Sequence, residues 1–241
     1  MISIICVYNN VSSLDEFLLS SLKNQSIDYE LILLDNTKKK FSNAAEALNY
    51  GGKKAKGDYL MFVHQDIDLL VDDWLENAEN ILNSLKNLGI AGVAGFPEVK
   101  KNPVILSNIM DGNPPQTIGI NITQSENVQT VDECLFFVPK SIFNKIQFDV
   151  ETCPDWHLYA VDYCLSLLKL NLSVYVIPCA LHHVSRSDSF SNQYYSTLNK
   201  ITKKHGTYFN KIYTTCCVWH TNRFRLLLNV FEDKIRRKIS S

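Results

Sequence analysis

The stretch Lys56-Gly57-Asp58-Tyr59-Leu60-Met61-Phe62-Val63-His64-Gln65-Asp66-Ile67-Asp68 decides the fold. A Gly-Asp turn leads into an apolar run, and the run ends abruptly in polar residues. Residues 59–63 are short, aliphatic and aromatic, which predicts a buried strand. In an open α/β sheet, ligands bind outside the carboxyl ends of the strands. The stretch therefore places one imidazole, His64, and two carboxylates, Asp66 and Asp68, where a ligand is expected.

These side chains have two interpretations. Hard cations bind carboxylate oxygens, and a metal held there can also hold phosphates, which favours a metal–diphosphate site. Asp is equally common in solvated turns at the ends of strands. The stretch alone does not decide between them.

The composition is that of an ordinary globular protein. The 241 residues suffice for one domain with an extension, and 46% are hydrophobic while 20% are charged. A net charge of −1 gives no support to nucleic-acid binding. The seven Cys are odd in number and form no C-x-x-C pair, so a reducing, cytoplasmic setting fits best. Neither a signal peptide nor a membrane span is expected, because no basic region precedes the first apolar residues and no apolar run approaches about 20 residues.

Predicted strands alternate with predicted helices along most of the chain. The strands cover 2–7, 30–34, 59–63, 90–95, 130–138 and 173–177. The helices begin after the caps Ser13, Asn43 and Asp72, and later cover 157–170, 193–205 and 221–241. The alternation predicts an α/β fold with a parallel sheet and right-handed crossovers. Residues 98–127 predict a long binding loop or lid. We expect a main domain over 1–188 and a helical extension over 189–241.

Polar residues recur where the predicted strands end or begin, and along the later part of the chain. They are Asp35, His64, Asp66, Asp132, Asp162, His182 and His183. Each one alone has an ordinary structural explanation. Their recurrence at one edge of a sheet favours a functional site.

The order of these motifs resembles that of the GT-A-fold glycosyltransferases of family 2. The resemblance covers about residues 1–185 and rests on the order and spacing of the motifs. They are Tyr8-Asn9, Asp35-Asn36, Asn43-Ala44-Ala45, Lys56-Gly57-Asp58-Tyr59, His64-Gln65-Asp66, Val131-Asp132, Phe148-Asp149, Asp162-Tyr163-Cys164-Leu165 and His182-His183. The His64-x-Asp66 pair is similar to a bacterial variant of the family's D-x-D motif.

The resemblance implies a GT-A (Rossmann-like) fold, with a mostly parallel sheet flanked by helices and a helical C-terminal extension, and a fixed set of roles. The reaction would be an inverting transfer of a sugar from a nucleotide-diphosphate sugar, most often a UDP-sugar, to a hydroxyl of a glycan or lipid-linked acceptor in surface polysaccharide synthesis. Asp66, with His182 or His183, would hold Mn²⁺ or Mg²⁺, and imidazole ligation favours Mn²⁺. Asp162 would be the catalytic base. Nucleotide contacts are expected from Tyr8, Asn9, Asp35, Asn43 and His64, and sugar or acceptor contacts from Asp132, Glu133 and His157.

The sequence also departs from the family pattern. His64 stands in place of the first Asp of the D-x-D motif, Asn36 in place of one member of an acidic pair, and Val161 in place of the Glu before Asp162. These departures leave open a second class of function, a nucleotide-sugar-binding or scaffold protein with weak or lost catalysis.

The C-terminal stretch carries an apolar stripe at helical spacing, consisting of Phe224, Leu227, Leu228, Phe231 and Ile235. Basic residues flank the stripe and follow it, namely Arg223, Arg225, Lys234, Arg236, Arg237 and Lys238. A helix packed on the domain or against a second copy is slightly favoured. The alternative is a helix lying on an anionic membrane surface, at the inner face of the membrane.

Overall fold

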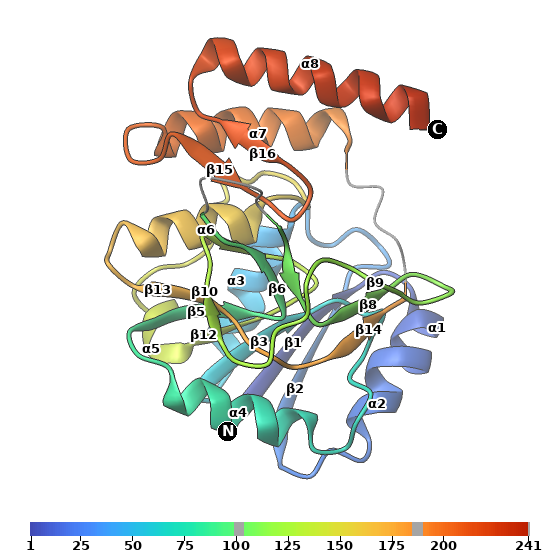
Figure 1. Cartoon of the computed structure of the whole chain (residues 1–241). Helices are drawn as coiled ribbons and strands as arrows, with labels where there is room; N and C mark the ends of the chain where they lie inside the picture. The colour runs from blue at the N-terminus through green and yellow to red at the C-terminus, as the bar shows by residue number, and fades with distance from the viewer. Residues whose placement is uncertain (99–103, 185–189, 241) are drawn as a thin grey trace.

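The computed structural model describes residues 1–98, 104–184 and 190–240. Its centre is a seven-stranded sheet in the order β10-β13-β5-β12-β3-β1-β2 (Figure 1). The strands are β1 (Ile2–Tyr8), β2 (Tyr29–Asp35), β3 (Tyr59–Val63), β5 (Leu88–Gly92), β10 (Glu126–Asn127), β12 (Leu135–Pro139) and β13 (Ser173–Val176). The predicted strand over 59–63 is confirmed at both ends.

Strands β1, β2 and β3 bring their carboxyl ends to one edge of the sheet. The apolar run of β1 is buried on both faces, as a central strand requires. It pairs in parallel with β2, with Tyr8 opposite Asp35, and with β3, with Cys6 opposite Val63. The polar residues that follow the three strands therefore start from the same edge.

Strand β12 runs antiparallel to both of its neighbours, β3 and β5. The sheet is therefore mixed but mostly parallel, as the fold class predicted, and the strand–helix alternation did not indicate the antiparallel direction of β12. Leu135, the first residue of β12, lies opposite Val63, the last residue of β3. As a result, the residues before β12 meet the residues after β3.

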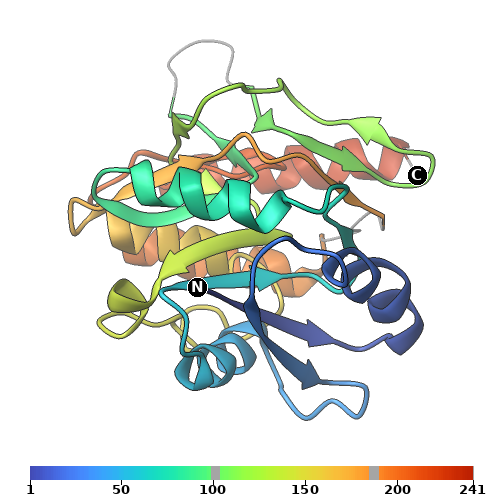
Figure 2. The same ribbon diagram turned by 90° about the horizontal axis from the view of Figure 1, so that it is seen from below.

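Helices cover both faces of the sheet (Figures 1 and 2). On one face lie α3 (Ala44–Lys54), α5 (Lys140–Phe143) and α6 (Tyr159–Leu168). On the other lie α4 (Trp74–Ser84) and a continuous helical stretch made of α1 (Val11–Ser13), the π-helical turn η1 (Leu14–Leu19) and α2 (Ser20–Leu22). The side chain that caps this stretch is Asn10, which accepts a hydrogen bond from the Ser13 amide at 3.2 Å, so the predicted cap at Ser13 is wrong.

The predicted excursion over 98–127 forms short strands rather than one loop, although residues 99–103 lie outside the described part of the chain. These strands are β7 (Leu106–Ser107), β8 (Ile109–Asp111) and β9 (Gln116–Thr117), followed by β10. Two small sheets result. One has the order β11-β6-β7, with β6 (Ala94–Phe96) and β11 (Thr130–Val131), and the other has the order β4-β14-β8-β9, with β4 (Ile67–Asp68) and β14 (Leu181–His183).

The C-terminal part consists of α7 (Asn192–His205), the hairpin β15 (Lys211–Tyr213) and β16 (Val218–His220), and α8 (Arg223–Ser240). Leu198, Ile212 and Trp219 belong to the same hydrophobic cluster as Phe136 of the central sheet. The predicted boundary between 188 and 189 falls outside the described residues. Within the ranges described, none of the helices combines the length and the apolar character needed to cross a membrane.

Candidate active site

A cavity of about 1350 Å³ opens at the carboxyl ends of β1, β2 and β3. Residues after these strands line it, together with residues before β12 and α6. The lining includes Tyr8, Asn9, Asn36, Thr37, His64, Gln65, Asp66, Glu133, Asp155, Trp156 and Tyr159. Four of the predicted nucleotide or metal residues, Tyr8, Asn9, His64 and Asp66, are thus brought to one cavity, and the predicted sugar contact Glu133 joins them.

Gln65 joins two of the strand ends that form the cavity wall. Its Oε1 atom accepts hydrogen bonds from the amides of Asn9 and Asn10 at 2.9 and 3.0 Å, and its Nε2 atom donates to Asn9 Oδ1 at 3.0 Å. The loop after β1 is therefore held against the residues after β3. Gln65 was not among the predicted site residues, because a Gln between two candidate ligands carries no signal of its own.

His64, Asp66 and His183 form a cluster suited to a metal ion. One ligand atom from each lies within 4.8 Å of the others. Asp66 and His183 are each 8% exposed, and the closest approach between them is 3.6 Å, from His183 Nε2 to Asp66 Oδ2. Two imidazoles and a carboxylate suit Mn²⁺, while the carboxylate alone would also suit Mg²⁺. His64 was expected to contact nucleotide, so its place in this cluster is a difference from the prediction.

The small sheet β4-β14-β8-β9 assembles this cluster. Strand β14 pairs with β4, which follows Asp66 directly, and His183 lies opposite Ile67. On its other side β14 pairs with β8, and His183 lies opposite Asp111. Asp111 Oδ1 accepts a hydrogen bond from His183 Nδ1 at 3.0 Å. This bond leaves Nε2 of His183 directed toward the cluster. Carboxylate groups orient metal-bound histidines in the same way, by binding the ring nitrogen that does not hold the metal.

The environment of His64 favours the neutral imidazole that a metal requires. Burial, together with the nearby His183, lowers the pKa of His64, although Asp66 and Asp132 act in the opposite direction. A neutral ring keeps a lone pair available for coordination. The side chain therefore fits a ligand role at neutral pH.

Glu133 faces the same cavity from the start of β12. Burial, reinforced by the charge of Asp132, raises the pKa of Glu133 to about 8, despite hydrogen bonds from amides at the start of α6. Of these, the Ala160 amide donates to Glu133 Oε1 at 3.4 Å. A carboxyl group with such a pKa is mostly protonated at neutral pH, and its proton-accepting form accumulates as the pH rises through that value.

Asp155 places a third carboxylate at the cavity, beside those of Asp66 and Glu133. Its Oδ1 atom accepts a hydrogen bond from the Trp156 amide at 2.7 Å. Its Oδ2 atom is buried and has no hydrogen-bond partner among the described residues. A hydroxyl group of a ligand would satisfy this oxygen. Asp155 and Trp156 were not among the predicted site residues, because their position at the cavity depends on how the loop before α6 packs.

Two predicted nucleotide contacts have structural roles instead. Asp35 is exposed, and its carboxylate accepts hydrogen bonds from the Thr37 amide and hydroxyl at 2.8 and 2.7 Å, which lowers its pKa. Asn36 and Thr37 line the cavity in its place. Asn43 caps α3 by accepting a hydrogen bond from the Glu46 amide at 2.8 Å, and it is absent from the cavity lining.

Three further predicted residues also point elsewhere. His182 contacts the Gly112 carbonyl oxygen at 2.9 Å, because successive side chains of a strand lie on opposite faces and His183 occupies the face toward Asp66. Asp132 accepts hydrogen bonds from the Thr215 hydroxyl at 2.6 Å and the Cys134 amide at 3.0 Å. The ring of His157 packs edge-on against Tyr194, with 6.0 Å between the ring centroids.

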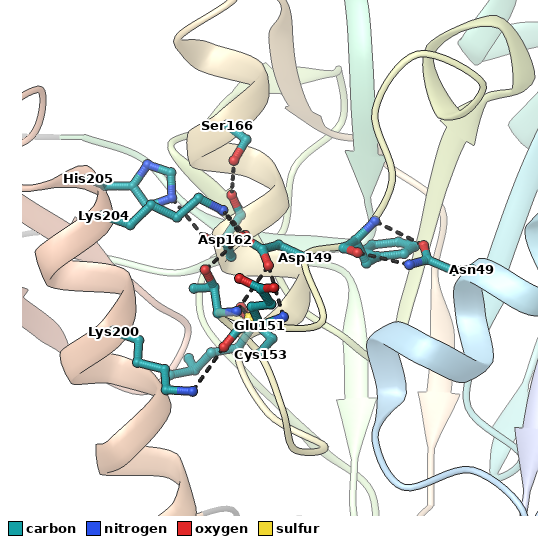
Figure 3. Close-up of polar contacts among 12 residues, drawn as sticks. Asn49, Asp149, Glu151, Cys153, Asp162, Ser166, Lys200, Lys204 and His205 are labelled. Atoms are coloured by element: carbon teal, nitrogen blue, oxygen red, sulfur yellow. Dashed lines mark hydrogen bonds and ion pairs between the residues drawn. The ribbon is translucent and has the colours of Figure 1, made fainter.

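Asp162 lies in a buried network between α6 and α7 (Figure 3). Its two oxygens pair with Lys204 Nζ at 2.7 Å and His205 Nε2 at 2.8 Å. Lys204 also contacts Asp149 at 2.8 Å. Asp162 is 2% exposed and does not line the cavity. A proton acceptor for a substrate hydroxyl would have to reach the cavity, which Asp162 does not. Its ion pairs instead hold α7 on the sheet domain.

Comparison with curated proteins finds partial relatives. An uncharacterized glycosyltransferase of Rickettsia bellii is 30% identical over 122 residues, which is 50% of this chain and 18% of the relative. A protein of Fuscovulum blasticum described as ATP synthase subunits region ORF 6 is 27% identical over 150 residues, covering 58% of this chain and 56% of the relative. The chain thus spans less than two thirds of either relative.

Solved structures share the fold at low sequence identity. GalNAc-T7 with UDP, GalNAc and Mn²⁺ superposes with a TM-score of 0.62 at 12% identity, covering 84% of this chain and 47% of that one. Staphylococcus aureus TarS 1–349 with UDP-GlcNAc gives 0.59 at 14% identity, covering 84% and 66%. A mannosyltransferase of Pyrobaculum calidifontis with GDP-Man and Mn²⁺ gives 0.59 at 12% identity, covering 84% and 63%.

These neighbours confirm the expected GT-A-type fold. A sequence profile confirms the expected family. The profile of the glycosyltransferase-like family matches residues 3–211, which include every residue of the cavity wall named above. The chain belongs to the glycosyltransferase-like family.

Proposed function

We propose that the chain catalyses a metal-dependent, inverting transfer of a sugar from a nucleotide-diphosphate sugar to a hydroxyl acceptor. The proposal rests on one observation. The His64–Asp66–His183 cluster lies at the large cavity at the carboxyl edge of the sheet, and His64 and Asp66 line that cavity. Cavities at this edge are the usual ligand sites of α/β folds. The related folds solved with UDP and GalNAc, with UDP-GlcNAc or with GDP-Man, two of them with Mn²⁺, support a nucleotide-sugar donor.

The donor would lie along the strand ends. Tyr8, Asn9 and Asn36 offer an aromatic face and amide groups for the nucleoside. His64, Asp66 and His183 would hold Mn²⁺, or Mg²⁺ as the second choice, and the ion would neutralise the negative charge on the diphosphate. The diphosphate is then an adequate leaving group. A UDP-sugar is the first donor to test.

Glu133 is the group we assign as the base, in place of Asp162. In a direct displacement, the acceptor oxygen forms a bond to the anomeric carbon as the bond from that carbon to the diphosphate breaks. The electron pair of the broken bond leaves with the diphosphate, and the hydroxyl proton passes to the Glu133 carboxylate. Attack from the side opposite the leaving group inverts the anomeric configuration. Asp155 Oδ2, which lacks a partner among the described residues, is placed to orient a sugar hydroxyl.

The second candidate is a protein that binds nucleotide sugars without turning them over. The position of Asp162 favours it, because the residue that the family resemblance assigned as base lies outside the cavity. The two candidates differ in the role of Glu133. Both need the strand-end residues to bind the nucleotide sugar, but the function of a binding protein would not depend on the ionisation of Glu133.

Calorimetry of UDP binding tests the site, and release of UDP from a UDP-sugar panel tests the chemistry. UDP should bind at least about tenfold more tightly with Mn²⁺ than with EDTA, and Asp66→Ala should abolish the difference. Asp58→Ala is the matched control, because Asp58 precedes the same strand and its side chain is 82% exposed. Equal binding with and without metal would reject the metal site. Binding without any UDP release, with water or with an added acceptor, would favour the binding protein.

A further inference from the structure

Helix α8 is held on the molecule by one narrow stripe. Leu226 is 5% exposed and Asp233 is 4% exposed, and together with Arg237 they share one side of the helix. Asp233 accepts hydrogen bonds from the Tyr195 hydroxyl at 2.7 Å and from Arg237 Nε at 2.8 Å. The Arg237 guanidinium also lies over the Phe190 ring, 3.0 Å from its centroid. These contacts fix α8 against α7 with a defined rotation about its axis.

The opposite side of α8 carries the apolar stripe predicted from the sequence, and the stripe is exposed. The exposed fractions are 71% for Phe224, 62% for Leu227, 47% for Leu228, 64% for Phe231 and 43% for Ile235. In Figure 1, α8 lies at the outer edge of the molecule, with α7 between it and the sheet. The slightly favoured expectation that this stripe packs on the domain is therefore wrong. Five clustered apolar side chains at a surface indicate an external partner.

Basic side chains border the exposed stripe on both sides. At about 100° of rotation per residue, Arg223 and Lys234 lie along one border, and Arg225 and Arg236 lie along the other. All four are exposed, although Lys234 Nζ lies over the Tyr195 ring of α7, 4.7 Å from its centroid, so that Arg223 is the basic group of its border that faces away from the domain. The helix carries six basic and two acidic side chains, whereas the whole chain has a net charge of −1. We call the apolar stripe with its four bordering basic residues the α8 surface.

We propose that the α8 surface binds an anionic lipid bilayer, with α8 lying in the plane of the interface. Phe224, Leu227 and Phe231 would enter the boundary between headgroups and acyl chains, and the bordering Arg and Lys side chains would reach the lipid phosphates. The buried side of α8, which carries Leu226, Asp233 and Arg237, stays packed on α7. Helix α8 would therefore lie on the bilayer as part of the folded protein. A second copy of the chain fits this surface less well, because an α8–α8 pair would bring the basic borders of both copies together.

Vesicle flotation of the full chain tests this proposal. The wild-type protein should float with vesicles of phosphatidylcholine and phosphatidylglycerol at low salt, and much less with pure phosphatidylcholine or at high salt. Leu227→Ser/Phe231→Ser should lower the partition coefficient at least about tenfold by removing inserted apolar area. Arg223→Glu/Arg225→Glu should remove the preference for anionic vesicles. The matched control is Ile120→Ser/Leu170→Ser, which changes two apolar residues that are 54% and 58% exposed elsewhere.

Circular dichroism and light scattering complete the test. The α8 variants change exposed side chains, so the helix signal and the melting temperature should stay at wild-type values. Failure of the wild-type protein to float would overturn the proposal, as would equal flotation of the Leu227→Ser/Phe231→Ser variant. A wild-type dimer that this variant splits, with no vesicle binding, would assign the stripe to self-association and also overturn it.

Discussion

At the scale of single residues, Asp111 is the clearest case of a side chain that acts through another. It holds Nδ1 of His183 at 3.0 Å and so directs Nε2 to the metal cluster. We predict that Asp111→Asn weakens Mn²⁺ binding about 10- to 100-fold, the usual cost of losing such a partner. Mn²⁺ titration followed by electron paramagnetic resonance measures this directly. Asp68→Asn is the control, since Asp68 lies nearby in β4 but outside the cluster, and an equal loss in both variants would contradict the assigned role.

Glu133 should give the pH profile its shape. The raised pKa, about 8, means that most Glu133 side chains carry a proton at pH 7, and the basic form accumulates as the pH rises through that value. We predict that kcat/KM increases as the pH rises through about 8, the pKa of Glu133, and levels off only about one pH unit above that value. In Glu133→Gln, turnover should fall about 10²-fold or more and the slope should disappear, while UDP binding persists. A variant that keeps the wild-type slope would show that another group titrates.

Asp162 distinguishes a structural from a catalytic role. Asp162→Asn leaves His205, which is fully buried, without its carboxylate, and it removes one of the two carboxylates that pair with Lys204. We predict a loss of about 2 kcal/mol or more in the free energy of unfolding, measured with urea, and turnover within a few-fold of wild type for the protein that remains folded. Asp15→Asn, at an exposed position, serves as the control. Unchanged stability with a turnover loss of about 10²-fold would return the base to Asp162.

At the scale of elements, the double glycine in α3 shows how packing can override helix propensity. A Cβ atom on Gly52 would overlap the ring of Phe143, which packs among Phe62 and Phe148 in the core. Ala is favoured over Gly in a helix by about 1 kcal/mol. We nevertheless predict that Gly52→Ala lowers the free energy of unfolding by about 1 to 3 kcal/mol. The steric overlap with Phe143 destabilises the fold by more than the higher helix propensity of Ala stabilises it.

A double-mutant cycle tests the cause of that loss. Phe143→Leu makes room beside α3, so adding Gly52→Ala to it should cost less than adding the same change to the wild-type protein. Strictly additive effects would show that the glycine matters for another reason. The close approach of Phe143 to Gly52 would then lack an energetic basis.

The local elements were largely predictable, and the pairings between distant ones were not. Continuous apolar runs placed β1, β2 and β3, and the Asn43 cap placed α3, because each of these signals lies within a few residues. The antiparallel direction of β12 carries no such signal, and it is what brings Glu133 to the cavity. The candidate metal cluster depends on β14 pairing with both β4 and β8, so the family resemblance could point to Asp66 and a histidine but not to Asp111.

At the scale of the whole molecule, the two predicted parts share one core. The boundary expected near residue 188 separates α7 from its partners, yet Leu198 packs with the sheet domain and both Lys204 and His205 pair with Asp162. Lys211 and Tyr213 of the hairpin also bond Gln129, at 3.1 and 2.8 Å. Residues 192–220 therefore behave as part of the main domain in their contacts.

Two shortened chains test that integration. A chain ending at residue 188 should show no cooperative thermal transition, because it exposes the apolar face that α7 covers and leaves Asp162 buried without Lys204 or His205. A chain ending at Asn222 should keep a single transition with a melting temperature a few degrees lower, since Leu226 and Asp233 are the buried side chains of α8 among the described residues. Differential scanning calorimetry measures both. A cooperative transition in the shorter chain would establish residues 1–188 as an independent domain, with the C-terminal part as an extension added to a complete fold.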